Sequence, residues 1–255
     1  MTYRVKVEGV PSEEALRRIL EEARAQGAEE IVVETSHAAG EGWIRAGFTE
    51  TSRVLSAPLE ALERHLGSER QPSFGSIHVQ TDAVEAVVNA VRQYVPRLPG
   101  RSRGSVVVPP RDGWTAVYDE LCDREPEMLR RLGGEISNRS GSLVLAMGVE
   151  DGRVVRYIAL DRGRVVDEYL SVPEYYGPLP PGEVIALGAN ARLMGRLTGA
   201  DPTRVKSVAV TATTPEGHLP GPELLDELAR LFGVQGAGHG YETARAIEGA
   251  IAIWR

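Results

Sequence analysis

The chain has 255 residues, and its 42% apolar and 25% charged content is typical of a globular protein and excludes a disordered one. The net charge of −7 argues against nucleic acid as a partner, because a phosphate backbone repels an acidic surface. The single cysteine, Cys122, excludes an intrachain disulfide and a cysteine metal cluster. No apolar run approaches the roughly 20 residues of a membrane helix, and the first residues do not form a secretory signal. We therefore expect a cytoplasmic protein without a membrane partner.

The first module is predicted to span residues 1–66 and to alternate strands with helices. Between the N-cap Ser12 and the stop signal Gly27, apolar residues recur at helical spacing. Strands are predicted at 3–7, 31–35 and 49–57, and short helices at 42–48 and 58–66. The polar residues that follow are predicted to form a linker, residues 67–75.

The second module, residues 76–255, is predicted to begin with helices and short strands. A helix at 82–95 would be capped by Thr81, and another would begin at Pro126, which suits a first helical turn. Between these helices, β-rich runs predict strands at 106–108 and 114–118.

Three strand-like runs within residues 142–170 predict an antiparallel meander. The turns between them are Asp151-Gly152 and Asp161-Arg162-Gly163. Asp-Gly between alternating runs indicates a tight hairpin, because both central positions need positive φ. A proline-rich loop at 171–182 follows, and then a helical C-terminal part. Its helices are predicted from the helix-start residues Asn190, Asp201 and Pro222, and a last strand is predicted at 250–254.

Part of the first module is similar to a known family. The helix end Ala23–Ala28, the strand at 31–35 and the run Trp43-Ile44-Arg45-Ala46-Gly47-Phe48 resemble the C-terminal half of a GNAT-type N-acetyltransferase. The resemblance implies a half-fold with an acetyl-CoA turn at Gly9 and Ser12. The predicted fold class is therefore α/β (α+β), with a truncated GNAT-like module before the meander module and its helical C-terminal part.

The turn at Gly9 and Ser12 departs from the family pattern in ways that oppose acetyl-CoA binding. The family binds the pyrophosphate at a glycine-rich helix N-terminus. Here Pro11 removes an N–H donor, and two carboxylates, Glu13 and Glu14, lie where the phosphates would bind. In addition, Trp43 replaces a tyrosine that often serves as general acid, and an indole cannot supply that proton. We interpret the turn as vestigial and expect no cofactor.

The cysteine and the histidines do not predict a catalytic or metal site by their spacing. Cys122 has no histidine near it in the sequence and is predicted to lie in the core. None of the five histidines has metal-ligand spacing to another, and His78 is predicted to be a core or edge residue. His239 ends the glycine-rich stretch 233–240, which lacks the lysine and hydroxyl of a P-loop and is interpreted as a flexible connector.

Aromatic and acidic residues of the second module give the candidate binding surface. Two adjacent tyrosines on a proline-stiffened loop suit recognition, although one ring could instead cover the edge of the meander. Period-two alternation places Asp167 and Tyr169 on one face of their strand and Glu168 on the other. The candidate binding residues are Trp114, Tyr118, Asp167, Tyr169, Tyr175 and Tyr176.

Three functions follow as hypotheses. The favoured one is a non-catalytic binding or regulatory protein whose second module recognises a small molecule or a protein, while the first module serves packing or self-association into a homo-oligomer. The first alternative is a divergent acetyl-CoA-dependent N-acetyltransferase completed by the second module or by a partner subunit. The second alternative is a toxin-neutralising or regulatory protein-interaction partner.

Overall fold

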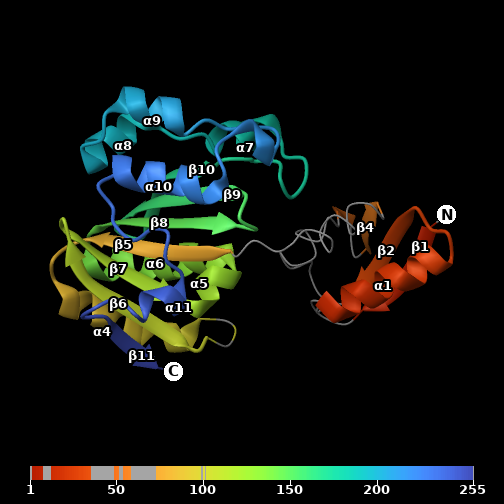
Figure 1. Cartoon of the computed structure of the whole chain (residues 1–255), viewed down its shortest axis with the longest axis horizontal. Helices are drawn as coiled ribbons and strands as arrows, with labels where there is room; N and C mark the ends of the chain where they lie inside the picture. The colour runs from red at the N-terminus through yellow and green to blue at the C-terminus, as the bar shows by residue number, and fades with distance from the viewer. Residues whose placement is uncertain are drawn as a thin grey trace. The chain divides into compact units, whose positions relative to one another are not determined.

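The computed structural model describes residues 2–7, 13–35, 49–51, 54–58, 73–98, 100 and 102–254. The chain is a mixed α/β protein, as predicted (Figure 1). It divides into two compact units: the first is Met1–Arg70 with Glu174–Leu179, and the second is Gln71–Pro173 with Pro180–Arg255. None of the helices in the described part of the chain is both long and apolar enough to cross a membrane.

The first unit contains a four-stranded sheet of order β1-β2-β4-β3. Strand β1 (Thr2–Val7) runs parallel to β2 (Glu30–Thr35), and helix α1 (Glu13–Ala25) connects them, because parallel neighbours need a crossover. The apolar stripe of α1 is buried, as its helical spacing predicts: Leu16, Ile19, Leu20 and Ala23. Gly27 ends the helix with φ +65°, a conformation that glycine adopts without strain.

Two predictions for the first unit are wrong. The single strand expected at 49–57 is a hairpin of β3 (Thr49–Thr51) and β4 (Val54–Pro58), because the chain folds back and pairs with itself. Pro58 ends β4 instead of opening a helix. It pairs with Glu30, the first residue of β2, at the edge of the ladder, where a missing N–H costs least. The helix predicted at 42–48, the remainder of the one at 58–66, and most of the linker lie outside the described residues.

The second unit is built on a seven-stranded antiparallel sheet of order β10-β9-β8-β5-β7-β6-β11. The strands are β5 (Phe74–Gln80), β6 (Gly104–Arg111), β7 (Trp114–Asp119), β8 (Leu143–Glu150), β9 (Val154–Asp161), β10 (Arg164–Leu170) and β11 (Ile251–Trp254). The meander β8-β9-β10 is confirmed. Its two turns have positive φ at Asp151 and Gly152 and at Arg162 and Gly163, and a third hairpin turns at Asp112-Gly113 in the same way.

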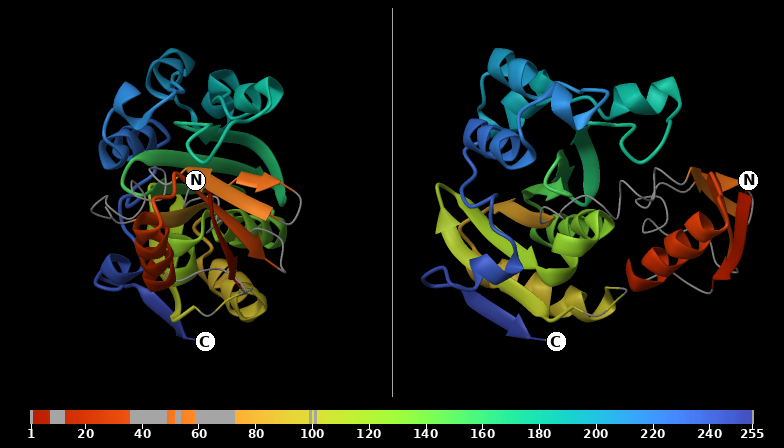
Figure 2. Two further views of the ribbon diagram at one scale, coloured as in Figure 1. Left: turned by 90° about the vertical axis from the view of Figure 1, so that its right-hand side faces the viewer. Right: turned by 45° about the vertical axis from the view of Figure 1, so that its right-hand side comes forward.

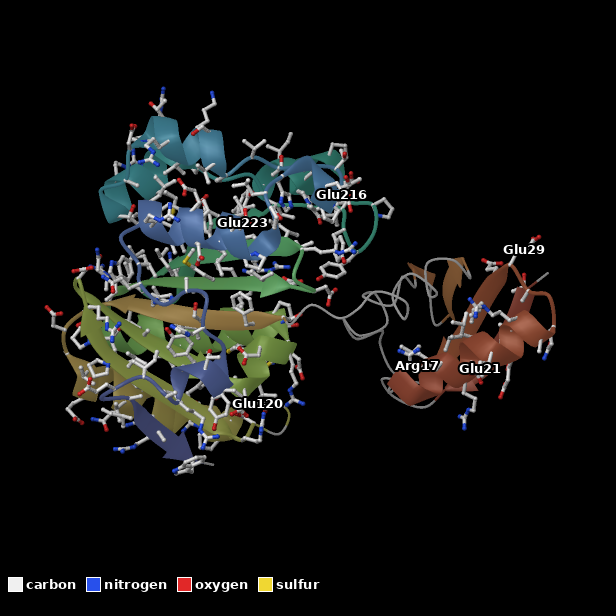
Figure 3. The ribbon with its side chains drawn as sticks, in the orientation of Figure 1. Arg17, Glu21, Glu29, Glu120, Glu216 and Glu223 are labelled. Carbon is white, nitrogen blue, oxygen red and sulfur yellow. The ribbon has the colours of Figure 1, made fainter. Side chains whose placement is uncertain are left out.

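Helices cover both faces of this sheet (Figures 1 and 2). On one face, α4 (Val84–Tyr94) and α6 (Pro126–Ser140) bury an aliphatic core with residues of β5 to β9. On the other face, α8 (Ala191–Thr198), α9 (Pro202–Val208) and α10 (Gly221–Leu231) pack mainly on β8 and β9. Charged side chains such as Glu223 of α10 point away from the sheet (Figure 3).

The shorter helices complete the second unit. They are η1 (Val95–Arg97), α5 (Glu120–Arg124), α7 (Pro181–Ala186), η2 (Pro215–Gly217) and α11 (Tyr241–Ala244). Helix α11 packs on β6 and β7 through Tyr241 and Ala244, on the same face as α10. Helix α4 begins two residues later than predicted. The Thr81 hydroxyl accepts from the Ala83 N–H in a local turn and so does not cap the helix.

Candidate functional site

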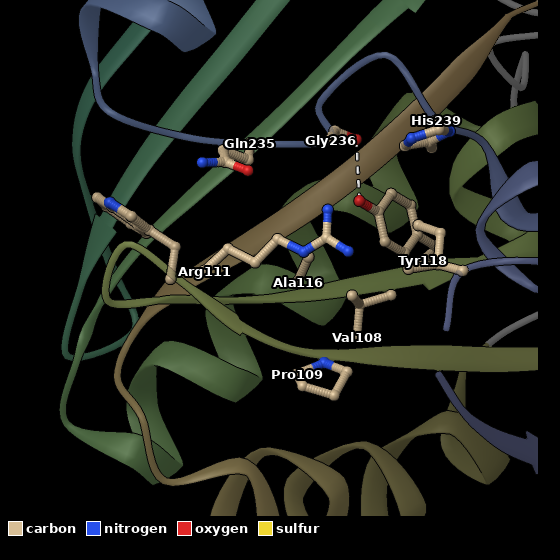
Figure 4. Close-up of a pocket in the computed structure, with 10 residues that line it drawn as sticks. Val108, Pro109, Arg111, Ala116, Tyr118, Gln235, Gly236 and His239 are labelled. Carbon is tan, nitrogen blue, oxygen red and sulfur yellow. Dashed lines mark hydrogen bonds between the residues drawn. The ribbon is translucent and has the colours of Figure 1, made fainter. Parts of the chain in front are cut away.

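A hollow lies over β6 and β7, on the face of the sheet that α10 and α11 cover, and is bordered by the chain between these two helices. Its volume is about 80 Å³, and it is called the Arg111 hollow here (Figure 4). The strands contribute Val108, Pro109, Arg111, Trp114, Ala116 and Tyr118. The chain between α10 and α11 contributes Gln235, Gly236 and His239, and Ile247 lies at the rim.

A β-bulge in β6 directs Arg111 toward the hollow. Val108 pairs with Ala116, but Arg111 pairs with Trp114, so one extra residue has entered β6 between Val108 and Arg111. The intervening Pro109-Pro110 has no N–H to continue the ladder. Residues paired across strands point to the same face, so Arg111 shares a face with Trp114 instead of facing α4.

Two hydrogen bonds hold the 235–239 segment above the strands. The Tyr118 hydroxyl donates to the Gly236 carbonyl oxygen at 2.9 Å, and the Gln235 side-chain amide donates to the Asp112 carboxylate. Gly236 has φ +79°, and a Cβ there would lie 2.7 Å from the Tyr118 hydroxyl oxygen. Glycine is therefore needed both for the backbone conformation and for the approach to Tyr118.

The polar side chains that reach the hollow are mostly cationic or neutral. Arg111 is exposed and forms no ion pair within the described part of the chain, and its guanidinium lies near the Tyr118 ring (Figure 4). His239 meets the Tyr118 ring edge-on at 6.4 Å between centroids. Burial raises the pKa of Tyr118 well above its ordinary value, so its hydroxyl stays protonated and keeps donating to Gly236.

A second, more open hollow of about 420 Å³ lies on the α10 side of the same segment. It shares Gly236 and His239 with the Arg111 hollow and adds Asp226 and Arg230 of α10. The 235–239 segment thus borders two concave regions.

A fully buried Ser76–His78 pair lies on β5, beside the hollow and on the same face of the sheet as Ala116. His78 Nε2 lies 2.8 Å from Ser76 Oγ, and the His78 ring meets Tyr118 edge-on. Burial lowers the pKa of His78 to about 3, so the ring is neutral near pH 7. His78 Nδ1 has no hydrogen-bond partner in the described part of the chain. The pair packs beside Tyr118, and because both residues are fully buried it cannot meet a ligand without a rearrangement.

The candidate binding residues named from the sequence do not gather on one surface. Trp114 and Tyr118 both line the Arg111 hollow, but they are only 6% and 1% exposed. Tyr169 is 0% exposed; its ring stacks on Tyr157 and its hydroxyl donates to the Val210 carbonyl oxygen. The prediction of an exposed surface formed by these aromatic residues is therefore wrong. Packing against α8–α10 buries Tyr169 in the core.

The other candidate residues have separate roles. Asp167 accepts from the Tyr157 hydroxyl at 2.7 Å and from the Asn190 N–H, so it joins β9 and β10 to the start of α8. Tyr175 and Tyr176 are partly exposed and pack edge-to-face on each other. Asp167 and Tyr169 share one face, as alternation predicts. Gly9 and Ser12 lie outside the described residues.

Cys122 and His239 complete the comparison with the sequence. Cys122 is buried, as predicted, and burial raises the pKa of its thiol, so it is a poor nucleophile. His239 belongs to a segment tied to β7 and to the Asp112-Gly113 hairpin, whereas a flexible connector was predicted. In the described part of the chain, no group of three His, Cys, Asp or Glu side chains could hold a metal ion.

Sequence reasoning missed Arg111, Gln235 and Gly236. The signal for Arg111 was a Pro-Pro pair in a strand, which indicates a bulge, directly before the hairpin dipeptide Asp112-Gly113. No local pattern joins it to Gln235 and Gly236, more than a hundred residues later. Comparison of the chain with family models, curated proteins and solved structures finds no match.

Proposed function

We propose that this chain is a binding protein that recognises a small molecule in the Arg111 hollow of its second unit. The proposal rests on the shape and composition of the hollow, which is lined by apolar groups and a few polar ones. Ala116 and Tyr118 of β7 form its floor, and the 235–239 segment, held by hydrogen bonds, forms its roof. Binding sites for small molecules have this composition and lie largely pre-formed.

The floor and the roof of the hollow are both supported by the core. Ala116 and Tyr118 belong to β7, which is buried along its whole length. A shift of these residues would disturb the packing of the sheet, so the floor is rigid. The roof is attached through Tyr118 and Asp112. A fixed site loses little conformational entropy when a ligand binds, which favours affinity.

The chemistry of the described side chains suits binding better than covalent catalysis. The Cys122 thiol is buried with a raised pKa, and Ser76 and His78 are both 0% exposed. A nucleophile must reach its substrate and be activated by a base that can take its proton. A neutral, enclosed imidazole beside an enclosed hydroxyl does not meet the first condition.

The test is an NMR screen of the ¹⁵N-labelled full chain against a cocktail of small polar and aromatic compounds. The proposal predicts saturable shifts of the Trp114 indole and Gly236 amide signals. The variant Ala116→Leu, which fills the floor, should abolish them, while Ala186→Leu on exposed α7 should not. Hits that shift only signals elsewhere would overturn the proposal.

The acetyltransferase alternative depends on residues 1–66 and stays a separate hypothesis. It predicts that acetyl-CoA binds the chain, and isothermal titration measures this directly. Binding that survives Ala116→Leu would favour that alternative, because its site would not be the Arg111 hollow.

A further inference from the structure

We propose that the ligand of the Arg111 hollow is a small organic anion, a carboxylate or a phosphate monoester, whose oxygens bind the Arg111 guanidinium. The inference rests on the proposed function and names the ligand class of the same site. It is carried by the charges around the hollow and by the bulge that directs Arg111 into it.

Arg111 forms no ion pair with a carboxylate in the described part of the chain, whereas about half of the arginines of the second unit do. Ion pairs within 4 Å join nine other arginines of this unit to Glu residues: Arg103, Arg124, Arg130, Arg131, Arg139, Arg156, Arg204, Arg230 and Arg245. In an acidic chain, a lone guanidinium beside a concave surface is an available counter-charge.

The lining of the hollow contains no carboxylate among the described residues. The carboxylate nearest in sequence, Asp112, accepts from the Gln235 side-chain amide and forms no ion pair with Arg111 within the described part of the chain. The backbone N–H of Gly236, a residue that lines the hollow, donates no hydrogen bond within the described part of the chain. His239 adds a ring that can donate to an anion in either tautomer or in its charged form.

The bulge at Pro109-Pro110 gives the second, independent argument. Without the extra residue, alternation would turn Arg111 toward the aliphatic core under α4. Bulges often re-aim one side chain next to a functional site. Here the re-aimed side chain is a planar guanidinium, whose paired donors match the two oxygens of a carboxylate or phosphate.

The apolar lining and the volume of the hollow limit the size and shape of the uncharged part of the ligand. Val108, Pro109 and Trp114 also line the hollow, and its volume of about 80 Å³ is several times that of one water but below that of a drug-sized site. An anion with a small planar or aliphatic body fits this space, whereas a nucleotide does not.

The experiment is isothermal titration of the full chain with benzoate, phenyl phosphate and the neutral isostere benzamide. Both anions, or the one of them that is the better match, should bind more tightly than benzamide. Arg111→Gln should weaken anion binding at least about tenfold, the usual loss for a charge-assisted hydrogen bond. Arg111→Lys should retain part of the affinity, and Arg192→Gln, at an exposed position of α8, should leave it unchanged. The stronger anion identifies the carboxylate or the phosphate class.

The failures of the two proposals are distinguishable. Equal affinity for benzoate and benzamide, both lost in Ala116→Leu and unaffected by Arg111→Gln, would overturn the anion proposal and leave the hollow a binding site. Anion binding that Arg192→Gln weakens as much as Arg111→Gln would mark nonspecific surface charge and also overturn it. If no probe binds while the cocktail screen gives hits in the hollow, the anion proposal alone fails.

Discussion

Single side chains of the second unit hold segments that are distant in the sequence. Tyr118 of β7 reaches the segment after α10, and the Asp123 carboxylate accepts from the backbone N–H groups of Gly75 and Tyr241. Asp123 thereby joins the start of β5 to the start of α11. Both residues help to define the frame in which the Arg111 hollow lies.

Tyr118→Phe should loosen the roof of the hollow. It removes the donor to the Gly236 carbonyl oxygen, and we expect a loss of about 1–2 kcal/mol in the free energy of unfolding. Amide hydrogen exchange at His239, whose N–H donates to the Gly236 carbonyl oxygen at 3.1 Å, should accelerate. Tyr241→Phe is the matched control, because the Tyr241 hydroxyl has no partner in the described part of the chain. Equal exchange rates of the His239 amide in both variants would contradict the assigned role.

Asp123 should make the chain less stable as the pH rises. Burial, the largest cause, raises the pKa of this carboxyl to about 6 from an ordinary 3.8. Between these values the folded state holds a proton that the unfolded state has lost, so the contribution of Asp123 to stability is greatest below pH 4 and falls until about pH 6. Its size is on the order of 2–3 kcal/mol.

Asp123→Asn tests this, because the amide cannot ionise. Urea unfolding at pH 4 and at pH 7 should show a smaller decrease for the variant than for the wild type. Other carboxyls, including Asp167 with its raised pKa, titrate alike in both chains and cancel in the difference. Parallel stability curves for the two chains would refute the role of Asp123.

Elements of the second unit are positioned by their turns and by ion pairs on the α6 side of the meander. The β9–β10 hairpin turns at Arg162-Gly163, and the Gly163 N–H donates to Ser137 of α6 at 3.1 Å. Four charged side chains continue this attachment: Arg130 of α6, Glu168 of β10, Arg156 of β9 and Glu150 of β8.

The glycines of two hairpins should respond differently to alanine. Gly113 and Gly163 both have positive φ, which costs an alanine roughly 1–2 kcal/mol. At Gly113 no atom lies within 4 Å of the added Cβ, whereas at Gly163 the Asn138 Cβ lies at 2.8 Å. Gly163→Ala should therefore cost a further 1–3 kcal/mol, roughly the range of overpacking, in urea unfolding. Equal losses would show that the hairpin moves away from α6 freely.

Arg156→Met should be much more destabilising than Arg130→Met. Arg156 pairs with both Glu150 and Glu168, whose side chains are 6% and 15% exposed, so its loss leaves two shielded carboxylates without that partner. We expect roughly 2–4 kcal/mol for Arg156→Met. Arg130 is 41% exposed, and its replacement should cost less than about 1 kcal/mol. Chemical unfolding measures both; a reversed order would contradict this account.

At the scale of the whole molecule, local signals predict much of the fold but not its assembly. The meander was predictable because Asp151-Gly152 and Gly163 specify tight turns within a few residues. The position of β5 between β8 and β7 was not, because alternation says which face is buried and not which strand lies beside it. The same holds for the site. Trp114 and Tyr118 could be selected from the sequence as aromatic residues of a strand, but their contact with Gln235 and Gly236 arises only from the tertiary fold.

The larger unit carries its own core. In its described part, three clusters of buried apolar residues draw all their members from residues 74–253. All residues that line the Arg111 hollow belong to this unit, so its core alone supports the site.

The most direct measurement of that claim is the side-chain NMR signal of Arg111 during a titration of the ¹⁵N-labelled full chain with benzoate. The account predicts that the Arg111 Nε–H and Gly236 amide signals move together and saturate, while the Arg192 Nε–H signal stays in place. An unmoved Arg111 signal, or equal movement of Arg111 and Arg192, would contradict it.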